Sequence, residues 1–261
     1  MKPHSVIVYG PMGCGKTTNS ATLMHISEMS HVSDDWQPGQ PIRRGHLHLT
    51  SATFGEIEGI GTGVSVVSFD SVMGHMRAEM NHIALATSIH ADNVAAGWWT
   101  DIVTGERLER NKAEMLMLTV SEVSEASAGF FSGENDDHLP EHPMFDVELG
   151  DICIRLYDQI GAMIAAGHQV KQCSAPVVDK DDVDAALLQV VNCLSEAMEH
   201  VRKNRLQEYT DSLCEALMAT YAIAEDYEVD LSAIIQMKRA YNAKRLDHKR
   251  EARLANGGKA F

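Results

Sequence analysis

The chain has 261 residues, enough for two domains, and its 37 Asp and Glu against 22 Lys and Arg give a formal net charge of -15. This acidity argues against nucleic acid as a partner, because binding to a phosphate backbone needs clustered Lys and Arg. No apolar run reaches membrane-spanning length, and the five cysteines show no metal-type spacing and leave one unpaired, so we expect a reducing, cytoplasmic compartment and no membrane partner.

The N-terminal segment carries a phosphate-binding pattern. A β-branched run at residues 5–9 leads into a loop that matches G-x-x-x-x-G-K-T, the P-loop, and an apolar helical pattern follows it. Backbone N–H groups of the loop, the Lys16 ammonium and the helix N-terminus are expected to meet a nucleotide phosphate, while Thr17 reaches Mg2+. The predicted nucleotide-binding residues here are Gly10, Gly13, Gly15, Lys16, Thr17 and Thr18.

The segment after the P-loop is less complete. Strands are expected near 46–50 and 64–69, but no strand reads as four hydrophobic residues followed by Asp. Asp34 and Asp70 are the candidates for a second metal-binding acid, and Asp34 with Asp35 can equally cap a turn before Trp36. The sequence therefore predicts a nucleotide-binding α/β domain over residues 1–77 and leaves its own turnover open.

From about residue 78 onward the apolar periodicity is helical, so we expect an all-α domain over residues 78–261. Pro140, Pro143 and Pro176 fall in two helix breaks, at 133–143 and 171–182. The predicted helices lie near 78–96, 106–131, 143–167, 183–203, 205–227 and 230–245.

Two of these helices carry acid pairs three residues apart, a Glu-x-x-Glu pair and a Glu-x-x-Asp pair, within apolar stretches. Residues three apart share a helix face, so two packed helices aim four carboxylates at one point. Such pairs are common on solvated faces, but carboxylates inside apolar helices are costly unless they are paired or metal-bound. Hard divalent cations, Mg2+ above all and Mn2+ as a substitute, are the expected occupants. The four predicted ligands are Glu122, Glu125, Glu148 and Asp151.

A di-iron helical bundle is the obvious rival to a magnesium site. Such bundles need Glu-x-x-His on two helices. Neither Glu122 with Glu125 nor Glu148 with Asp151 is followed by a His at the third position, so the sequence favours magnesium.

The stretch from about residue 82 to 261 resembles the MazG-like, all-α nucleoside triphosphate pyrophosphohydrolases, which are related to dimeric dUTPases, and most closely the phage members that act on dATP or dGTP. The matching segments are Ala-Ala-Gly-Trp-Trp-Thr (95–100), Ser-Glu-Val-Ser-Glu-Ala (121–126), Asp-Asp-His-Leu-Pro (136–140), Glu-Leu-Gly-Asp-Ile-Cys-Ile-Arg (148–155), Lys238 with Asn242 and Arg245, and Gly-Gly-Lys-Ala-Phe (257–261). The resemblance implies that the four acids bind Mg2+ and that Lys238 and Asn242 complete the nucleotide site. It also implies a homo-oligomer or a tandem pseudo-dimer, and the host cytoplasm if the protein is phage-encoded.

The chain departs from the single-module pattern in one way. Residues 162 to about 228 separate the Glu-x-x-Asp helix from the Lys-x-x-x-Asn helix, and they contain a second acid quartet. The domain is thus open to interpretation as a tandem, partly degenerate duplication of the MazG type. The quartet is a possible second metal set, a partner across a pseudo-dimer, or a structural echo with solvated acids, and it consists of Glu196, Glu199, Glu208 and Asp211.

These residues suit cleavage of a phosphoanhydride. Such cleavage depends on positioning and on neutralising phosphate charge, which bound Mg2+ achieves while lowering the pKa of a bound water. Glu125 is our candidate for the base, Lys238 and Arg245 are expected to meet phosphate charge, and Asn242 to hydrogen-bond a phosphate or sugar oxygen.

The leading hypothesis is therefore a Mg2+-dependent hydrolase that converts a nucleoside triphosphate, dATP or dGTP by resemblance, to the monophosphate and pyrophosphate. The P-loop domain binds ATP or another nucleotide in an auxiliary role. One alternative is a small P-loop nucleotide kinase or ATPase with a helical accessory domain. A second is a nucleotide-sensing module without turnover.

Overall fold

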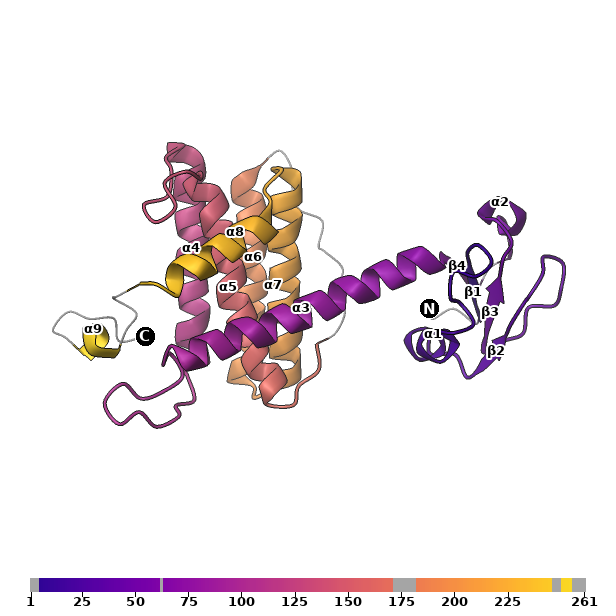
Figure 1. The fold of residues 1–261 in the computed structure, drawn as a ribbon, viewed down its shortest axis with the longest axis horizontal. Coiled ribbons are helices and arrows are strands. Elements are labelled where there is room, and N and C mark those ends of the chain that lie inside the picture. Colours follow the sequence, from indigo (N-terminus) through magenta and orange to yellow (C-terminus); the bar gives the residue numbers. More distant parts are fainter. Residues whose placement is uncertain (1–4, 62, 171–181, 246–249, 255–261) are drawn as a thin grey trace. The chain divides into compact units, whose positions relative to one another are not determined.

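The computed structural model describes residues 5–61, 63–170, 182–245 and 250–254, and these combine a small parallel sheet with a set of long helices (Figure 1). The chain divides into two compact units, Met1–Met80 and Asn81–Phe261. The predicted break at 171–182 with Pro176, and the tail segment 257–261, lie outside the described residues, apart from Asp182.

The first unit is built on a four-stranded parallel sheet in the order β2-β3-β1-β4. The predicted strands at 5–9, 46–50 and 64–69 are confirmed. Residue 32 lies in a further short edge strand, which the sequence did not predict. The strands are β1 (Ser5–Tyr9), β2 (His31–Ser33), β3 (His46–Thr50) and β4 (Val64–Ser68).

Both faces of this sheet are covered, because successive residues of a strand point to opposite faces. Val6 and Val8 of β1 pack on one face with Leu23 of helix α1 (Ser20–Ile26). Ile7 packs on the other face with Trp36 and with Ile57 of the short helix α2 (Phe54–Ile57). The carboxyl end of β1 is thereby fixed, and the P-loop begins there.

Helix α3 (Phe69–Ala95) follows β4 directly and belongs to both units. The sequence predicted its start near residue 78, with a domain boundary at 77/78. The structure starts it nine residues earlier, because the Ser68 side chain accepts the backbone N–H of Ser71 and Phe69 is buried against the first unit. A continuous helix thus replaces the predicted gap.

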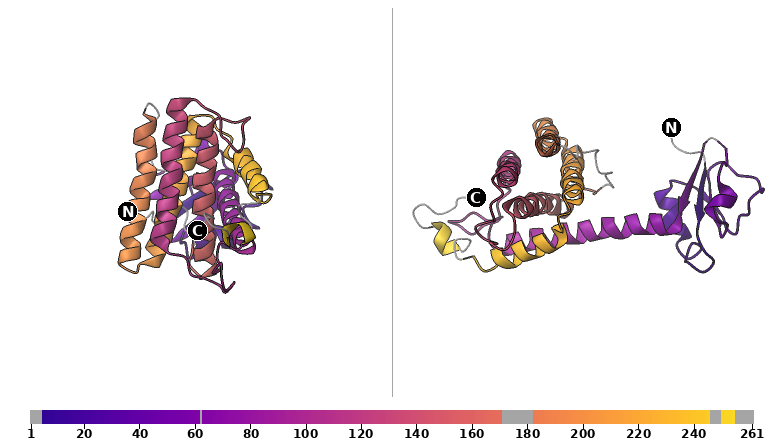
Figure 2. Two further views of the ribbon diagram at one scale, coloured as in Figure 1. Left: turned by 90° about the vertical axis from the view of Figure 1, so that its left-hand side faces the viewer. Right: turned by 90° about the horizontal axis from the view of Figure 1, so that it is seen from above.

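The second unit is centred on four helices, α4 (Lys112–Ser132), α5 (Met144–Ala165), α6 (Val183–Arg202) and α7 (Leu206–Asp226). Helix α4 packs against α5 and α6, and α7 packs against α5 and α6, so the four form a bundle that the right-hand view of Figure 2 shows nearly end-on. Their inward faces make one large apolar core. Helix α4 starts six residues later than predicted, because the Asn111 side chain caps it by accepting the N–H of Ala113.

Helix α8 (Leu231–Asn242) crosses the bundle against α5, and a short helix α9 (Arg250–Leu254) follows (Figure 1). Two glycines of α5 allow close approach of other helices. A Cβ on Gly150 would lie 2.5 Å from Cγ2 of Ile234 in α8, and one on Gly161 would collide with the backbone of Ala86 in α3. Gly150 therefore sets how closely α8 can approach α5.

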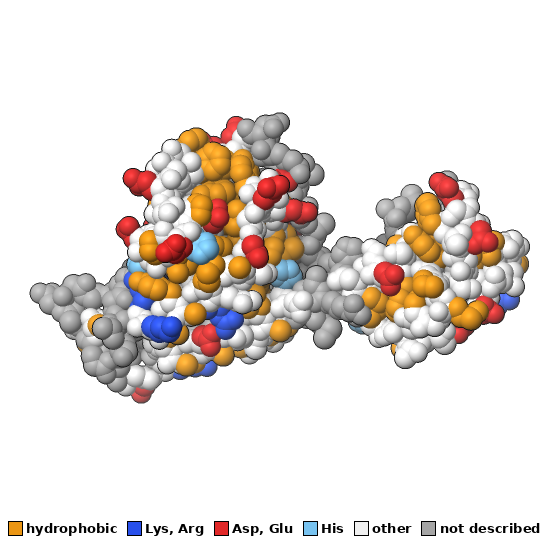
Figure 3. Space-filling model, turned by 45° about the horizontal axis from the view of Figure 1, so that its top comes forward, with side chains coloured by type: hydrophobic (Ala, Val, Ile, Leu, Met, Phe, Trp, Pro, Cys, Tyr) orange, Lys and Arg blue, Asp and Glu red, His pale blue; other side chains and the backbone are white. Residues whose placement is uncertain are grey.

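On the face of the helical unit shown in Figure 3, apolar side chains lie between charged ones. On the face shown in Figure 3, acidic side chains are spread widely, whereas Lys and Arg side chains gather in one area. In the described part of the chain, no helix is both long enough and apolar enough to cross a membrane.

Candidate active site

The structure brings together three of the four predicted metal ligands. Glu122 of α4 and Glu148 and Asp151 of α5 each offer a carboxylate oxygen, and these oxygens lie within 4.8 Å of one another. Glu122 and Glu148 are buried and Asp151 is half-buried. The convergence follows from the packing of α4 on α5, with each acid pair on one helix face.

Glu125, the fourth predicted ligand, lies apart from this cluster of three. Its side chain is exposed, but it lines the same cavity as the other acids. Partial desolvation and the neighbouring Glu122 carboxylate raise its pKa, while Arg155 and Lys238 oppose the rise. A carboxylate of raised pKa beside a metal-type cluster is suited to accepting a proton.

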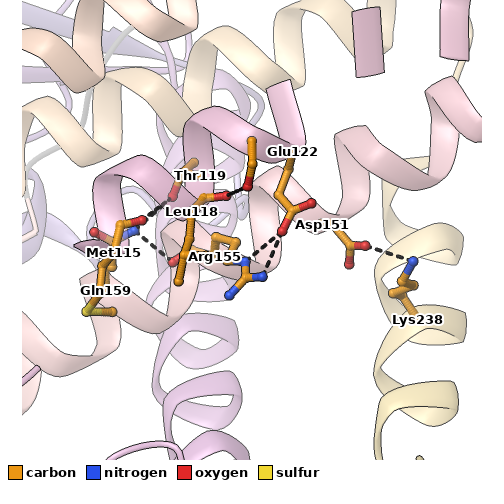
Figure 4. Close-up of polar contacts among 9 residues, drawn as sticks. Met115, Leu118, Thr119, Glu122, Asp151, Arg155, Gln159 and Lys238 are labelled. Atoms are coloured by element: carbon orange, nitrogen blue, oxygen red, sulfur yellow. Dashed lines mark hydrogen bonds and ion pairs between the residues drawn. The ribbon is translucent and has the colours of Figure 1, made fainter. Parts of the chain in front are cut away.

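Two cations form ion pairs with acids of the cluster (Figure 4). Arg155 donates from Nε (2.9 Å) and Nη2 (2.8 Å) to Oε1 of Glu122. Lys238 of α8 lies 2.7 Å from Oδ2 of Asp151 and 3.8 Å from Oδ1 of Asp136. Burial alone would lower the pKa of Lys238, but Asp151, Asp136 and Glu148 outweigh it and the pKa is raised. Lys238 therefore stays protonated.

Glu148 is the acid that these cations leave uncompensated. Its side chain is 4% exposed, and its Oε2 atom is buried without a hydrogen-bond partner. Burial, then Asp151 and Glu122, raise its pKa to about 9. Burial also raises the pKa of Asp151, to about 6, against the opposing charge of Lys238. Without another cation, the cluster thus keeps a proton on Glu148 at neutral pH.

The site residues line one cavity of about 310 Å3 within the second unit. The predicted residues Lys238, Asn242 and Arg245 lie in its wall. The Oδ1 atom of Asn242 is buried without a partner, and the Arg245 guanidinium lies 5.8 Å from the Tyr241 ring centroid. The remaining lining residues are Asn93, Trp98, Arg110, Met115, Leu118, Ser121, Glu122, Glu125, His138, Glu148, Asp151, Ile154, Arg155, Asp158 and Gln159.

The donor set fits a hard divalent cation. Carboxylate oxygens are the ligands that Mg2+ and Mn2+ prefer. The unpartnered oxygen of Glu148 is a buried acceptor with nothing to bind, and such atoms are rare in folded proteins. Two cations, Arg155 and Lys238, face a larger number of acids, so a further positive charge would relieve the repulsion.

Sequence reasoning assigned no role to Arg155, Asp136 or Arg110. Arg155 follows Asp151 by four residues, so helical spacing was a signal that could have found it. Asp136 lies in the loop between α4 and α5, where its Oδ1 accepts the backbone N–H groups of His138 (2.9 Å) and Leu139 (2.7 Å). Its nearness to Lys238 depends on tertiary packing alone.

The second acid quartet does not form a comparable cluster in the described part of the chain. The side chains of Glu196 and Glu199 are 63% and 45% exposed, and Glu199 pairs with Arg202 and with Lys203 on its own helix. Glu208 is exposed, and Asp211 accepts a hydrogen bond from Gln207 at 2.8 Å. Glu196, Glu199 and Asp211 thus have basic or amide partners on their own helices, and Glu208 is exposed to solvent, as expected for solvated acids.

The P-loop residues lie at the carboxyl end of β1. Gly13 and Gly15 have φ of 77° and 104°, which glycine adopts without strain. The buried Lys16 ammonium donates to the carbonyls of Gly10 (2.6 Å) and Pro11 (2.9 Å) of its own loop. Thr18 is exposed, and the predicted helix after the loop is present as α1, which starts at Ser20.

Of the two acids proposed to assist the P-loop, the structure brings one to it. The Thr17 hydroxyl donates to Oδ1 of Asp34 at 3.2 Å. The same oxygen accepts the backbone N–H of Asp35, so Asp34 also shapes the turn before Trp36. Asp70 lies exposed in the first turn of α3.

Comparison of the chain with models of known protein families, with curated protein sequences and with solved structures found no match. The resemblance to MazG-like enzymes therefore stays a hypothesis.

Proposed function

We propose that the helical unit is a MazG-type, Mg2+-dependent nucleoside triphosphate pyrophosphohydrolase, which converts a (d)NTP to the monophosphate and pyrophosphate. One observation carries the proposal. An unpartnered, buried oxygen of Glu148 lies among converging carboxylates, in a cavity whose wall also contains Lys238 and Asn242. A metal-type acid cluster opposite a cation and an amide is an arrangement suited to a phosphate ester of a nucleoside.

Glu122, Glu148 and Asp151 would hold the metal. Bound Mg2+, or Mn2+ in its place, would neutralise charge on phosphate oxygens and lower the pKa of a bound water. Asp151 pairs with Lys238 and Glu122 with Arg155, so the two cations orient both carboxylates.

The other residues act on the water and on the phosphates. Glu125, whose pKa is raised, accepts a proton from the attacking water. The water oxygen bonds to the α-phosphorus, and the bond from that phosphorus to the oxygen that bridges to the β-phosphate breaks as pyrophosphate leaves. Lys238 and Arg245 meet phosphate oxygens, and the Asn242 amide hydrogen-bonds a phosphate or sugar oxygen.

The P-loop unit has an auxiliary nucleotide-binding role in this proposal. Lys16 would leave its own loop carbonyls to reach a phosphate, and Thr17 with Asp34 would serve the accompanying Mg2+. The contact between Thr17 and Asp34 is also the observation that favours the second candidate, a P-loop kinase or ATPase, because it places an acid beside the metal-binding hydroxyl.

Product analysis separates these functions. The full chain is incubated with each dNTP and with ATP, in Mg2+ and in excess EDTA, and the nucleotides and phosphates are resolved by anion-exchange chromatography. We expect monophosphate and pyrophosphate in Mg2+ and no cleavage in EDTA. Diphosphate and phosphate would favour the P-loop as the catalyst, and cleavage that persists in EDTA would exclude the metal site.

A further inference from the structure

Arg110 is a buried cation in the wall of the same cavity that no step of the proposed reaction uses. It directly precedes the cap of α4, its side chain is 9% exposed, and its Nη2 atom is buried without a hydrogen-bond partner. Leaving a buried guanidinium donor unpaired is costly, because the group loses its hydration without compensation. A ligand that fills the cavity would supply the missing acceptor.

Arg110 lies near an aromatic ring and near a carboxylate that hydrogen bonds hold in place. The Trp99 ring centroid lies 6.0 Å from its guanidinium carbon. The buried carboxylate of Asp158, another wall residue, accepts Nδ1–H of His90 (2.8 Å) and Nε1–H of Trp99 (3.0 Å). Arg110 has no ion pair with Asp158 or with any other described residue. The cavity therefore presents a donor-only group near a carboxylate that is held in place.

This end of the cavity is distinct from the acid cluster. Asp158 follows Asp151 by seven residues on α5, and Met115 precedes Glu122 by seven on α4, which places both about 10 Å along the helices from the acids. The apolar side chains of Leu118 and Ile154 line the stretch between. With the phosphates at the acids, a nucleoside has the length to reach this end with its base.

We propose that Arg110, together with Asp158, reads the base of the substrate, and that the base is a 6-oxopurine of the guanine type. Arg carries only donors, which match the O6 and N7 acceptors of guanine, whereas adenine offers an amino group in place of O6. The Asp158 carboxylate has lone pairs left for the N1–H and amino group on the other edge. This inference rests on the proposed function and narrows its substrate from dATP or dGTP to dGTP.

The test compares kcat/KM for pyrophosphate release from dGTP, dITP and dATP in the full chain and in three variants. The parent is expected to favour dGTP and dITP, which share O6 and N7, over dATP by roughly ten- to a hundredfold. Arg110→Gln should reduce cleavage of dGTP and dITP by a similar factor and reduce dATP less, because Gln can pair with adenine. Arg110→Lys keeps the positive charge but loses the planar, paired donors of the guanidinium, so it should also lose the preference for dGTP and dITP over dATP. The exposed Arg107→Gln is the matched control and should change nothing.

Calorimetric titration with dGMP and dAMP gives a second readout that needs no turnover, and thermal unfolding shows whether each variant folds. Stronger binding of dGMP in the parent, lost in Arg110→Gln, is the expected result. If Arg110→Gln reduced kcat/KM equally for all nucleotides while Arg110→Lys kept full activity, Arg110 would contact a phosphate, and the inference would be overturned. Equal binding of dGMP and dAMP by the parent would also overturn it. If the parent released no pyrophosphate, the proposed function would be wrong. The titration with dGMP and dAMP would still show which base the cavity binds.

Discussion

Glu148 is the residue on which the electrostatics of the site depend. Its pKa is raised from 4.5 to about 9 in the folded chain, so between these values the folded state holds a proton that the unfolded state has lost. The free energy of unfolding therefore falls as pH rises from about 5 to 9. In EDTA, we expect the Tm of Glu148→Gln to exceed that of the parent at pH 8 and to depend less on pH.

Thermal unfolding by circular dichroism between pH 5 and 9 measures this difference. Added Mg2+ should raise the Tm of the parent and leave that of Glu148→Gln nearly unchanged, because the cation replaces the proton on Glu148. Identical pH slopes in the two proteins would mean that Glu148 is not the uncompensated acid.

Asp151 should respond in the opposite way, although it lies in the same cluster. Its carboxylate pairs with the buried Lys238 ammonium at 2.7 Å. Asn in its place would leave this ammonium with the more distant Asp136 carboxylate, at 3.8 Å, so part of the compensation for a buried charge would be lost. Asp151→Asn is expected to lower the free energy of unfolding in urea by about 1–2 kcal/mol, the cost of a lost hydrogen bond to a charged group, because Asp136 remains near Lys238 and burial already disfavours the charged form of Asp151. Glu199→Gln, an exposed acid that pairs only along its own helix, is the control and should stay within about 0.5 kcal/mol of the parent. A stable Asp151→Asn would show that Lys238 does not need this partner.

At the scale of elements, the approach of α8 to α5 positions Lys238 and Asn242. A methyl group on Gly150 would meet Cγ2 of Ile234 at 2.5 Å, and a branched side chain cannot turn away without moving α8. Gly150→Ala should therefore destabilise the protein by about 1–3 kcal/mol and lower kcat. Adding Ile234→Ala should restore part of both.

Gly74→Ala offers the matched control for this change. Gly74 also lies inside a helix, α3, but has open space around it, so alanine should be neutral or stabilising by about 0.5–1 kcal/mol. If Gly150→Ala behaves like Gly74→Ala, then α8 is not held by that close approach.

The sequence predicted the helices themselves more accurately than the segments that connect them. The apolar periodicity placed the helices observed at Val183–Arg202 and Leu206–Asp226 to within a residue at each end. It missed that α3 starts at Phe69, because the cap by Ser68 and the burial of Phe69 override the local pattern. It found the acids of the cluster because helical spacing fixes their common face, but not Asp136 or Arg110, whose positions depend on loops between helices. It could not separate the two quartets, since only packing shows that Glu148 forms no ion pair with any described residue. The pairing of Glu199 with Arg202, three residues further along the same helix, was within reach of helical spacing.

At the scale of the whole molecule, the two units have different tasks in the proposed function. Lys16→Ala in the full chain should remove nucleotide binding by the P-loop, because the ammonium is the loop's only charged phosphate ligand in the pattern. Pyrophosphate release by the helical unit should persist at the parent rate. Binding measured with a fluorescent ATP analogue, alongside the product assay, checks both. Loss of cleavage in Lys16→Ala would make the P-loop the catalytic centre.

The central claim is that the acid cluster of α4 and α5 cleaves a nucleoside triphosphate between its α- and β-phosphates. It is tested most directly by following dGTP with 31P NMR in Mg2+, in the presence of the parent or of Glu148→Gln. We expect equimolar dGMP and pyrophosphate with the parent, and a rate at least about a hundredfold lower with Glu148→Gln. Release of dGDP and phosphate, or pyrophosphate release at an equal rate by the two proteins, would contradict it.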